Sequence, residues 1–511
     1  MDREITFEHR KVTFMDTGLA KSANEFSTQR SQAVVTLRKQ KRQESIRYKR
    51  LKQTTSPSCN LSLDKVLNEL DISKVSTVKN LRKLLSYQKF DFNKLVQMCP
   101  NIIEILTPGL NNPQSELAFE VSWCLTNLAL GPSYLIMEIS KLIPAISAFI
   151  INPVNKMLAE QACWVLGNLA ADSFDLRNGI RQVCGLVKGI SALLQFKIPS
   201  LSAITCWTLC NLIRGSNPDI SLFVENGVIF PVLDLTQRDP NSDQCIEALW
   251  FLSLLTNNTS PEAFQQIFKE ENISRFFLIL SSANDPKLII PILRIFGNAF
   301  LYYPYIDYLF NRNFIELLIQ FLSTESSQIQ RETAWLISNI VSCPREYIDI
   351  LMSSNLSNEI LDLLIWLLDN DAGDIKAEAG IALYNICEVQ SSKYLLRILR
   401  KKGERLISFY QEVINNVPMW LKLGIQAIYD VDLLKASLGF CQICFEFSIQ
   451  NQLDIPEETY SALNSSDLRE ALENCYFVFK DLRGQNEQFM KVFCSDLLKR
   501  YCEGNQGFTF T

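Results

Sequence analysis

Trp164-Val165-Leu166-Gly167-Asn168 places an indole and a carboxamide four residues apart, and this Trp-x-x-x-Asn spacing returns along the chain. Two residues four apart on a helix share one face. The complete pairs that recur at the repeat interval are Trp123/Asn127, Trp164/Asn168, Trp207/Asn211 and Trp335/Asn339. Incomplete pairs continue the frame as Trp250/Leu254, Arg294/Asn298 and Ile381/Asn385. We call these seven pairs the ladder; their first positions lie 41 to 46 residues apart.

A period of about 40–47 residues is typical of armadillo and HEAT arrays. From Leu61 onward apolar residues recur at helical spacing, as at Val78, Leu81 and Leu85. Turn signals precede the ladder segments, and we interpret each as the turn that opens a new repeat. They are Asn111-Asn112-Pro113, Asn152-Pro153, Ile198-Pro199, Asp239-Pro240 and Asp285-Pro286. The sequence therefore predicts an all-α fold, a right-handed superhelical solenoid of armadillo repeats.

Charge and pattern divide the chain into four regions. Residues 1–53 carry a net charge of +7 against −12 for the rest, and we expect this basic segment to be mostly disordered. Residues 54–74 are a linker and a first helix, and residues 75–390 hold about eight repeats. Residues 391–511 stay helical but lack the ladder, which indicates a divergent cap or, less simply, a specialised partner surface. The basic segment could be a solvated tail, a nucleic-acid arm, or a segment that docks on the acidic body.

The composition argues against a catalytic or metal-binding function. The chain has one histidine, His9, which leaves no histidine-based triad or metal site, and it has no phosphate-binding glycine loop. Its 15 cysteines are scattered through apolar helical patterns, as expected for buried thiols in a reducing compartment. Cys441 and Cys444 form one C-x-x-C without a second pair, so we expect no zinc site. We predict no enzyme, no cofactor, no secretion signal and no membrane span.

The ladder itself indicates a peptide groove. Asparagine is a mediocre helix former whose buried amide needs partners, so its repetition beside tryptophan suggests a used surface. The last helix of each repeat lines the concave side of such a solenoid. Lysine and arginine stems could lie between the indoles while the asparagines bind the peptide main chain. Acidic residues beside the ladder would select the cationic heads; the candidates are Asp172, Glu247, Glu332 and Glu378. A plain core role for each tryptophan remains the alternative.

Several local stretches resemble the importin-α family of nuclear import adaptors. The resemblance covers about residues 75–390. It rests on Leu81-Arg82-Lys83-Leu84-Leu85-Ser86, on Phe119-Glu120 before Trp123, on Glu160-Gln161-Ala162 before Trp164, and on Ile329-Gln330-Arg331-Glu332 before Trp335. Arg294 falls where that family replaces tryptophan by arginine, and Arg214 where it has an arginine after the third asparagine. Leu254 stands where the family usually has a tyrosine.

The resemblance implies binding of lysine- and arginine-rich nuclear localisation signals, in the cytoplasm and the nucleus. The major site would comprise Trp123, Asn127, Trp164, Asn168, Asp172, Trp207, Asn211 and Glu247. The minor site would comprise Arg294, Asn298, Glu332, Trp335, Asn339, Glu378 and Asn385, and would be weakened by the missing tryptophan at Ile381. The basic segment is similar to the family's importin-β-binding, autoinhibitory segment through Arg38, Lys39, Lys41, Arg42, Arg47, Lys49 and Arg50.

Three functions from different classes follow. The first is a nuclear import adaptor with importin-β, basic cargo and an export receptor as partners. The second is a divergent scaffold of the same build that serves one dedicated protein partner. The third, nucleic-acid binding through the basic segment, is disfavoured because a body of net charge −12 repels phosphate.

Overall fold

The computed structural model describes residues 62–87, 90–215, 218–258, 260–300, 306–310, 313–343, 345–369, 373–388, 392–417, 428–451, 456–463 and 465–479, with six positions between 491 and 498. Those residues form helices and turns and include no strand. The predicted basic segment, residues 1–53 with Arg38, Lys39, Lys41, Arg42, Arg47, Lys49 and Arg50, lies outside the described residues. So does most of the predicted linker, residues 54–61.

The described residues fall into two compact units, one ending at Ala283 and one beginning at Asn284. The N-terminal unit contains α2 (Leu63–Asn68), α3 (Val75–Leu85), α4 (Phe92–Met98), α5 (Ile102–Leu106), η1 (Thr107–Leu110), α6 (Glu116–Leu128), α7 (Ser133–Ser140), α8 (Ile143–Ile151), α9 (Lys156–Asp172), α10 (Phe174–Arg181), α11 (Leu186–Leu194), α12 (Pro199–Leu212), α13 (Ser221–Glu225), α14 (Ile229–Thr236), α15 (Asp243–Thr256), α16 (Pro261–Ile267) and α17 (Glu270–Ser282).

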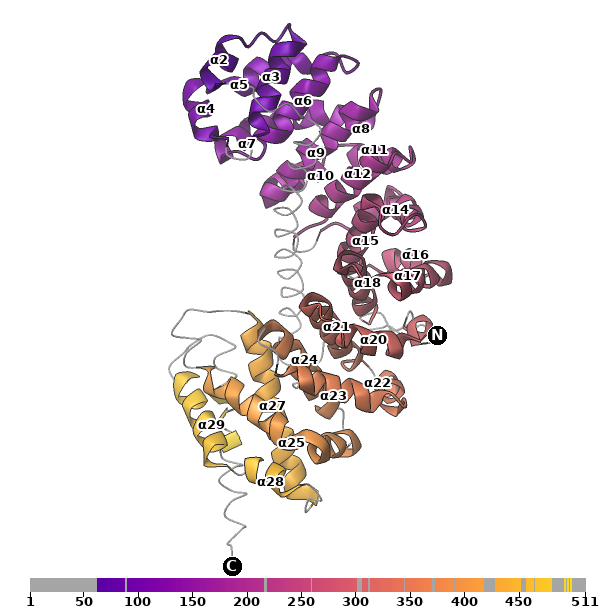
Figure 1. The fold of residues 1–511 in the computed structure, drawn as a ribbon, viewed down its shortest axis with the longest axis vertical. Helices are drawn as coiled ribbons and strands as arrows, with labels where there is room; N and C mark the ends of the chain where they lie inside the picture. The colour runs from indigo at the N-terminus through magenta and orange to yellow at the C-terminus, as the bar shows by residue number, and fades with distance from the viewer. Residues whose placement is uncertain are drawn as a thin grey trace, which may run out of the picture. The chain divides into compact units, whose positions relative to one another are not determined.

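In this unit the ladder-bearing helices pack in succession. Helix α3 contacts α6, α6 contacts α9, α9 contacts α12, and α12 contacts α15. Helices α8, α11 and α14 form a second row beside the row of ladder helices α9, α12 and α15 (Figure 1). The core between the two rows is aliphatic and fully buried, as at Leu166, Ile190 and Leu209. Each repeat thus buries its apolar faces against its neighbours, as an armadillo solenoid does.

The ladder helices begin where local chemistry starts a helix. The hydroxyls of Ser115 and Ser242 accept hydrogen bonds from main-chain N–H groups at the start of α6 and α15. Pro199 occupies the first position of α12, where its missing N–H costs nothing. The predicted turns are therefore present, but they do not open repeats. They separate the second helix of a repeat from its last, ladder-bearing helix, because caps and prolines mark a helix start wherever it falls.

The C-terminal unit repeats the arrangement. It contains α18 (Pro286–Ala299), α19 (Asp307–Phe310), α20 (Phe314–Leu322), α21 (Ser327–Ile340), α22 (Arg345–Ser353), α23 (Ser357–Leu367), α24 (Gly373–Glu388), α25 (Ser392–Asn415), α27 (Ile428–Asn451), α28 (Glu457–Leu463) and α29 (Ser466–Phe479). Helices α18, α21 and α24 pack in succession, and α27 packs against α24. The stacking of helices therefore continues beyond residue 390, whereas the Trp/Asn pairs do not.

Among the described helices, no single one is both long and apolar enough to cross a membrane, and one bent pair, α7 with α8, meets the criteria of length and composition only.

Candidate functional site

The ladder residues of the N-terminal unit lie on consecutive packed helices. Trp123 is on α6, Trp164 on α9, Trp207 on α12 and Trp250 on α15. The rings of Trp164 and Trp207 are 5.2 Å apart between centroids and inclined at 43°. Trp123 is half-buried, whereas the other three indoles are at most 9% exposed. The helices therefore bring the predicted indoles into one row. Most of these indoles are packed between the helices rather than projecting into solvent.

A glycine makes room for the next indole. A Cβ placed on Gly167 would lie 2.3 Å from the six-membered ring of Trp207, and one on Gly297 would lie 2.3 Å from that of Trp335. Both glycines directly precede a ladder asparagine. These two indoles therefore pack over the backbone of the preceding ladder helix, at a place where a larger residue would displace them.

The ladder asparagines join neighbouring repeats. The amide nitrogen of Asn168 donates to the carbonyl of Thr126 at 3.1 Å, and that of Asn339 to the carbonyl of Gly297 at 3.1 Å. Asn385 donates to the carbonyl of Ser338 at 3.3 Å. In all three cases the acceptor is the residue immediately before the preceding ladder asparagine. We call this hydrogen bond, with the indole contact beside it, the repeat seam.

Two asparagines bond differently. Asn127 donates to the hydroxyl of Ser86 at 3.2 Å, and Asn211 donates to the carbonyl of Trp207 within its own helix, also at 3.2 Å. The side-chain oxygens of Asn168, Asn211 and Asn385 are buried and have no hydrogen-bond partner in the described part of the chain. An unpartnered buried acceptor costs about 1–3 kcal/mol. A ligand that brought an N–H group to these oxygens would remove that cost.

Arg82 extends the ladder by one repeat and was not among the predicted site residues. It lies 41 residues before Trp123, with Ser86 four residues after it. Its guanidinium lies 4.0 Å from the centre of the Trp123 ring, and its Nε lies 2.6 Å from the Glu120 carboxylate. Burial raises the pKa of Glu120 above its ordinary value, against the opposing charge of Arg82. Extending the repeat period backward from Trp123 would have found this residue.

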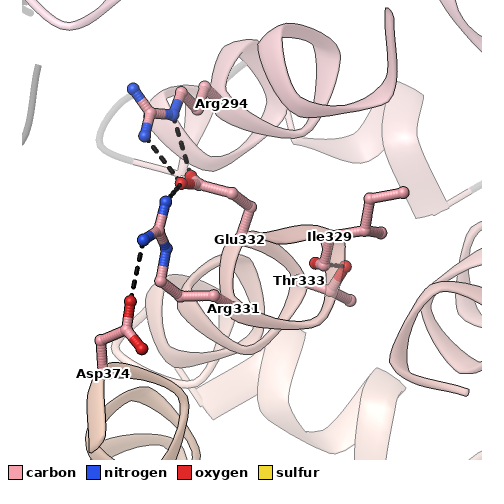
Figure 2. Close-up of polar contacts among 6 residues, drawn as sticks. All are labelled: Arg294, Ile329, Arg331, Glu332, Thr333 and Asp374. Carbon is pink, nitrogen blue, oxygen red and sulfur yellow. Dashed lines mark hydrogen bonds and ion pairs between the residues drawn. The ribbon is translucent and has the colours of Figure 1, made fainter. Parts of the chain in front are cut away.

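Arg294 makes the matching contact in the C-terminal unit (Figure 2). Its guanidinium donates to both oxygens of Glu332, from Nε at 2.9 Å and from Nη2 at 2.7 Å. Arg331 donates to the same carboxylate at 2.9 Å and to Asp374 at 2.9 Å. Burial lowers the pKa of Arg331, but the charges of Glu332 and Asp374 outweigh burial and raise it above the ordinary value. The predicted cation-selecting carboxylate of Glu332 is thus already shared by two guanidinium groups.

The other predicted acids differ in exposure. Asp172 is exposed at the end of α9, whereas Glu247 and Glu378 are 5% and 1% exposed. Leu254 is buried, and Ile381 and Arg214 are half-buried. Burial lowers the pKa of Arg214 below its ordinary value. The roles of these residues in peptide binding stay predictions.

Of the thirteen cysteines in the described residues, eleven are buried, as at Cys124, Cys163 and Cys245, whereas Cys99 is half-buried and Cys184 is exposed; none of the thirteen is in a disulfide. Cys441 and Cys444 lie buried within α27, where burial raises the pKa of the Cys441 thiol to about 12. A metal ligand must be a thiolate, so this environment disfavours metal binding. Across the described ranges, no three His, Cys, Asp or Glu side chains are grouped to hold a metal ion.

Comparison with known proteins agrees with the fold. The family model described as Armadillo/beta-catenin-like repeat matches residues 303–342, a segment that ends just after the ladder helix α21. A crystal structure of an engineered protein superposes with a TM-score of 0.62 at 17% identity, covering 85% of this chain and 97% of that one. The predicted armadillo-repeat solenoid is therefore confirmed.

The sequence relatives are importin-α subunits. Importin subunit alpha-9 of Arabidopsis thaliana is 26% identical over 329 residues, 61% of this chain and 61% of the relative. Importin subunit alpha-2 of Oryza sativa subsp. japonica is 25% identical over 62% of this chain and 60% of the relative. Importin subunit alpha-1a of the same plant is 27% identical over 67% and 68%. The chain thus matches about three fifths of the length of the first two relatives, and it is a divergent, importin-α-like armadillo-repeat protein.

Proposed function

We propose that this importin-α-like chain is a non-enzymatic nuclear import adaptor. It binds lysine- and arginine-rich nuclear localisation signals along the ladder and importin-β through residues 1–53, and it moves between cytoplasm and nucleus. The observation that carries this proposal is the row of indoles and asparagines on consecutive helices, where the side-chain oxygens of Asn168 and Asn211 have no hydrogen-bond partner among the described residues. Its importin-α relatives support the same role.

The chemistry of the row suits an extended basic peptide. Main-chain N–H groups of the peptide would donate to the unpartnered asparagine oxygens, whatever the side chains. Lysine and arginine stems would lie on the indoles, where cation–π attraction contributes about 0.5–2 kcal/mol per site. The exposed carboxylate of Asp172 would attract a cationic head.

The two halves of the ladder should bind unequally. The N-terminal set Trp123, Trp164 and Trp207 is complete. The C-terminal set has Ile381 in place of an indole, and its Glu332 is engaged by Arg294 and Arg331. The major site therefore lies in the N-terminal unit.

Fluorescence polarisation with a labelled lysine-rich signal peptide tests the groove, using the full chain and a chain lacking residues 1–53. The shortened chain should bind more tightly, because it lacks the competing basic segment. Replacing Trp164 and Asn168 by alanine should weaken binding about tenfold or more, and Asn385→Ala much less. No measurable binding by the shortened chain would refute the groove proposal.

A second measurement tests the partner assigned to the basic segment. Importin-β should be retained by the immobilised full chain and lost when residues 1–53 are removed. Retention by both forms would place the contact elsewhere. The export receptor is part of the same proposal and would be tested by the same retention assay.

The engaged Glu332 and the residue Ile381 favour one alternative, a scaffold dedicated to a specific protein partner. Such a scaffold would need only part of the ladder. Affinity purification that recovers one stoichiometric partner, without varied basic cargo, would support the scaffold over the adaptor.

A further inference from the structure

A cleft outside the ladder lies on α10, α11 and the segment around α13. Its volume is about 460 Å³, and its lining includes Phe174, Asn178, Arg181, Gly185, Asp219 and Asn226. None of the lining residues belongs to the ladder, so the cleft has no role in the proposed groove. All of it lies within the N-terminal unit.

Arg181 gives the cleft a buried positive charge. The residue is 8% exposed, and its guanidinium donates to the side-chain oxygen of Asn178, one turn earlier on the same helix. Within the described ranges it forms no ion pair with a carboxylate. Most of its N–H donors are therefore left for a ligand, and the buried charge has not been neutralised.

A second guanidinium lies one turn before the first. Arg177 is 7% exposed, and among the described residues it donates only to main-chain carbonyls, from Nε to Ala170 at 2.9 Å and from Nη1 to Arg214 at 3.4 Å. Burial and the neighbouring charges of Arg214 and Arg181 lower the pKa of Arg177 to about 10. An anion near α10 would relieve this repulsion between like charges.

The start of α11 lies at the same cleft. Its N-cap is Gly185, with φ of 76°, and no side chain caps this nine-residue helix. Gly185 and Val187 line the cleft, so the positive end of the helix dipole lies beside the Arg181 side chain. The amide nitrogen of Asn178 adds neutral donors, whereas that of Asn226 already donates one hydrogen to the Leu222 carbonyl at 2.8 Å. Burial lowers the pKa of Arg181 below its ordinary value, and the exposed carboxylate of Asp219, the opposing group, offsets only part of this effect.

We propose that this cleft binds a phosphate monoester, either a free one or a phosphorylated side chain of another protein. The Arg181 guanidinium, the N-terminus of α11 and the Asn178 amide supply donors from different elements of the cleft, and Arg177, which does not line it, adds a second positive charge nearby. Donors from several directions suit a tetrahedral dianion better than a planar carboxylate. A dianion also gains more than a monoanion from the excess of positive charge around it, although Asp219 repels both. Phe174, 51% exposed at the rim, offers an apolar face to the carbon part of the ligand.

Phosphorus-31 NMR on the full chain tests the proposal. Inorganic phosphate, phenyl phosphate and a short phosphotyrosine peptide are each titrated and line broadening is measured, with the unphosphorylated peptide as competitor. Saturable broadening is expected for the organic phosphates. A higher affinity for the peptide than for phenyl phosphate would assign the site to phosphorylated proteins, and the reverse order to free phosphate esters.

Three variants locate the binding. Arg181→Gln should weaken affinity about tenfold, through loss of charge-assisted hydrogen bonds. Lys188→Gln removes an equal charge from an exposed residue of α11 that does not line the cleft, and should change affinity less than about twofold. Asp219→Asn should strengthen binding, a gain that misfolding cannot imitate. Equal losses in Arg181→Gln and Lys188→Gln, no gain in Asp219→Asn, or broadening that does not saturate would each overturn the proposal.

Discussion

Gly167→Ala should destabilise the chain, although alanine is the better helix former. The substitution gains about 0.5–1 kcal/mol in helix propensity. Against this, the new Cβ would lie 2.3 Å from the ring of Trp207, where carbon atoms normally stand about 3.5–4.0 Å apart. The ring would have to move by more than about 1 Å, yet it is 5% exposed and packs against the ring of Trp164. Overpacking of this kind costs about 1–3 kcal/mol, so we expect a net loss of about 1–2 kcal/mol.

Gly179→Ala is the matched control. Gly179 also lies inside a helix, α10, but its Cβ would meet no atom within 4 Å. Only the propensity gain remains, so this variant should be more stable than the parent by about 0.5–1 kcal/mol.

Thermal denaturation followed by circular dichroism compares the two variants with the parent in the same scan. The melting transition should fall in Gly167→Ala and rise in Gly179→Ala, by a few degrees per kcal/mol at most in a chain of this size. An equal gain in both variants would show that Trp207 yields without cost, and the packing described for the ladder would then be wrong.

Three further predictions concern the ladder and the core. Arg294→Ala should cost about 3 kcal/mol in urea unfolding because it leaves part of the Glu332 charge unpaired, and Glu332→Gln in the same chain should restore some of that loss; simple additivity of the two would contradict the pairing. Asn168→Asp should be more destabilising than Asn168→Ala at pH 7, since a carboxylate would face the Thr126 carbonyl, and the difference should shrink at pH 4, where the acid can donate; an unchanged difference would argue against this hydrogen bond. Burial raises the thiol pKa from 9.0 to about 12 at Cys163, Cys245 and Cys441, so the folded state holds these protons more tightly. Their contribution to stability is complete below about pH 9 and is lost as pH rises towards 12, and the melting temperature should fall over that range less steeply when the three are replaced by alanine.

The repeat period could be recognised in the sequence because the Trp/Asn pairs of the ladder recur at a nearly constant interval. Trp123, Trp164 and Trp207 alone define the step, and the ladder helices follow from it. The position of repeat boundaries was not readable, because Pro199 and Ser242 mark the start of a helix without telling which helix of the repeat begins there.

The contacts of the charged ladder residues also could not be predicted from the sequence. The sequence places the Glu332 carboxylate three residues before Trp335, but it does not show whether a cationic side chain is already paired with that carboxylate. Its partners come from a residue 38 positions earlier and from its own neighbour Arg331, and only packing of α18 on α21 brings the first of these within reach. Arg82 was overlooked because it lies one period before the first Trp/Asn pair, and the ladder was not extended backward beyond Trp123.

The repeat seam gives some ladder asparagines two roles, because they bond the preceding repeat as well as contributing to the surface. Asn339 fixes its own repeat to the carbonyl before Asn298, and Asn385 fixes the next repeat to the carbonyl before Asn339. If the ladder binds a peptide as proposed, replacing Asn168, Asn339 or Asn385 would therefore also weaken the contact of its repeat with the preceding one. A change in binding specificity at these asparagines would for that reason also weaken the packing between repeats. New specificity should therefore arise first at ladder positions without this hydrogen bond, such as Leu254, or in helices that carry no ladder residue.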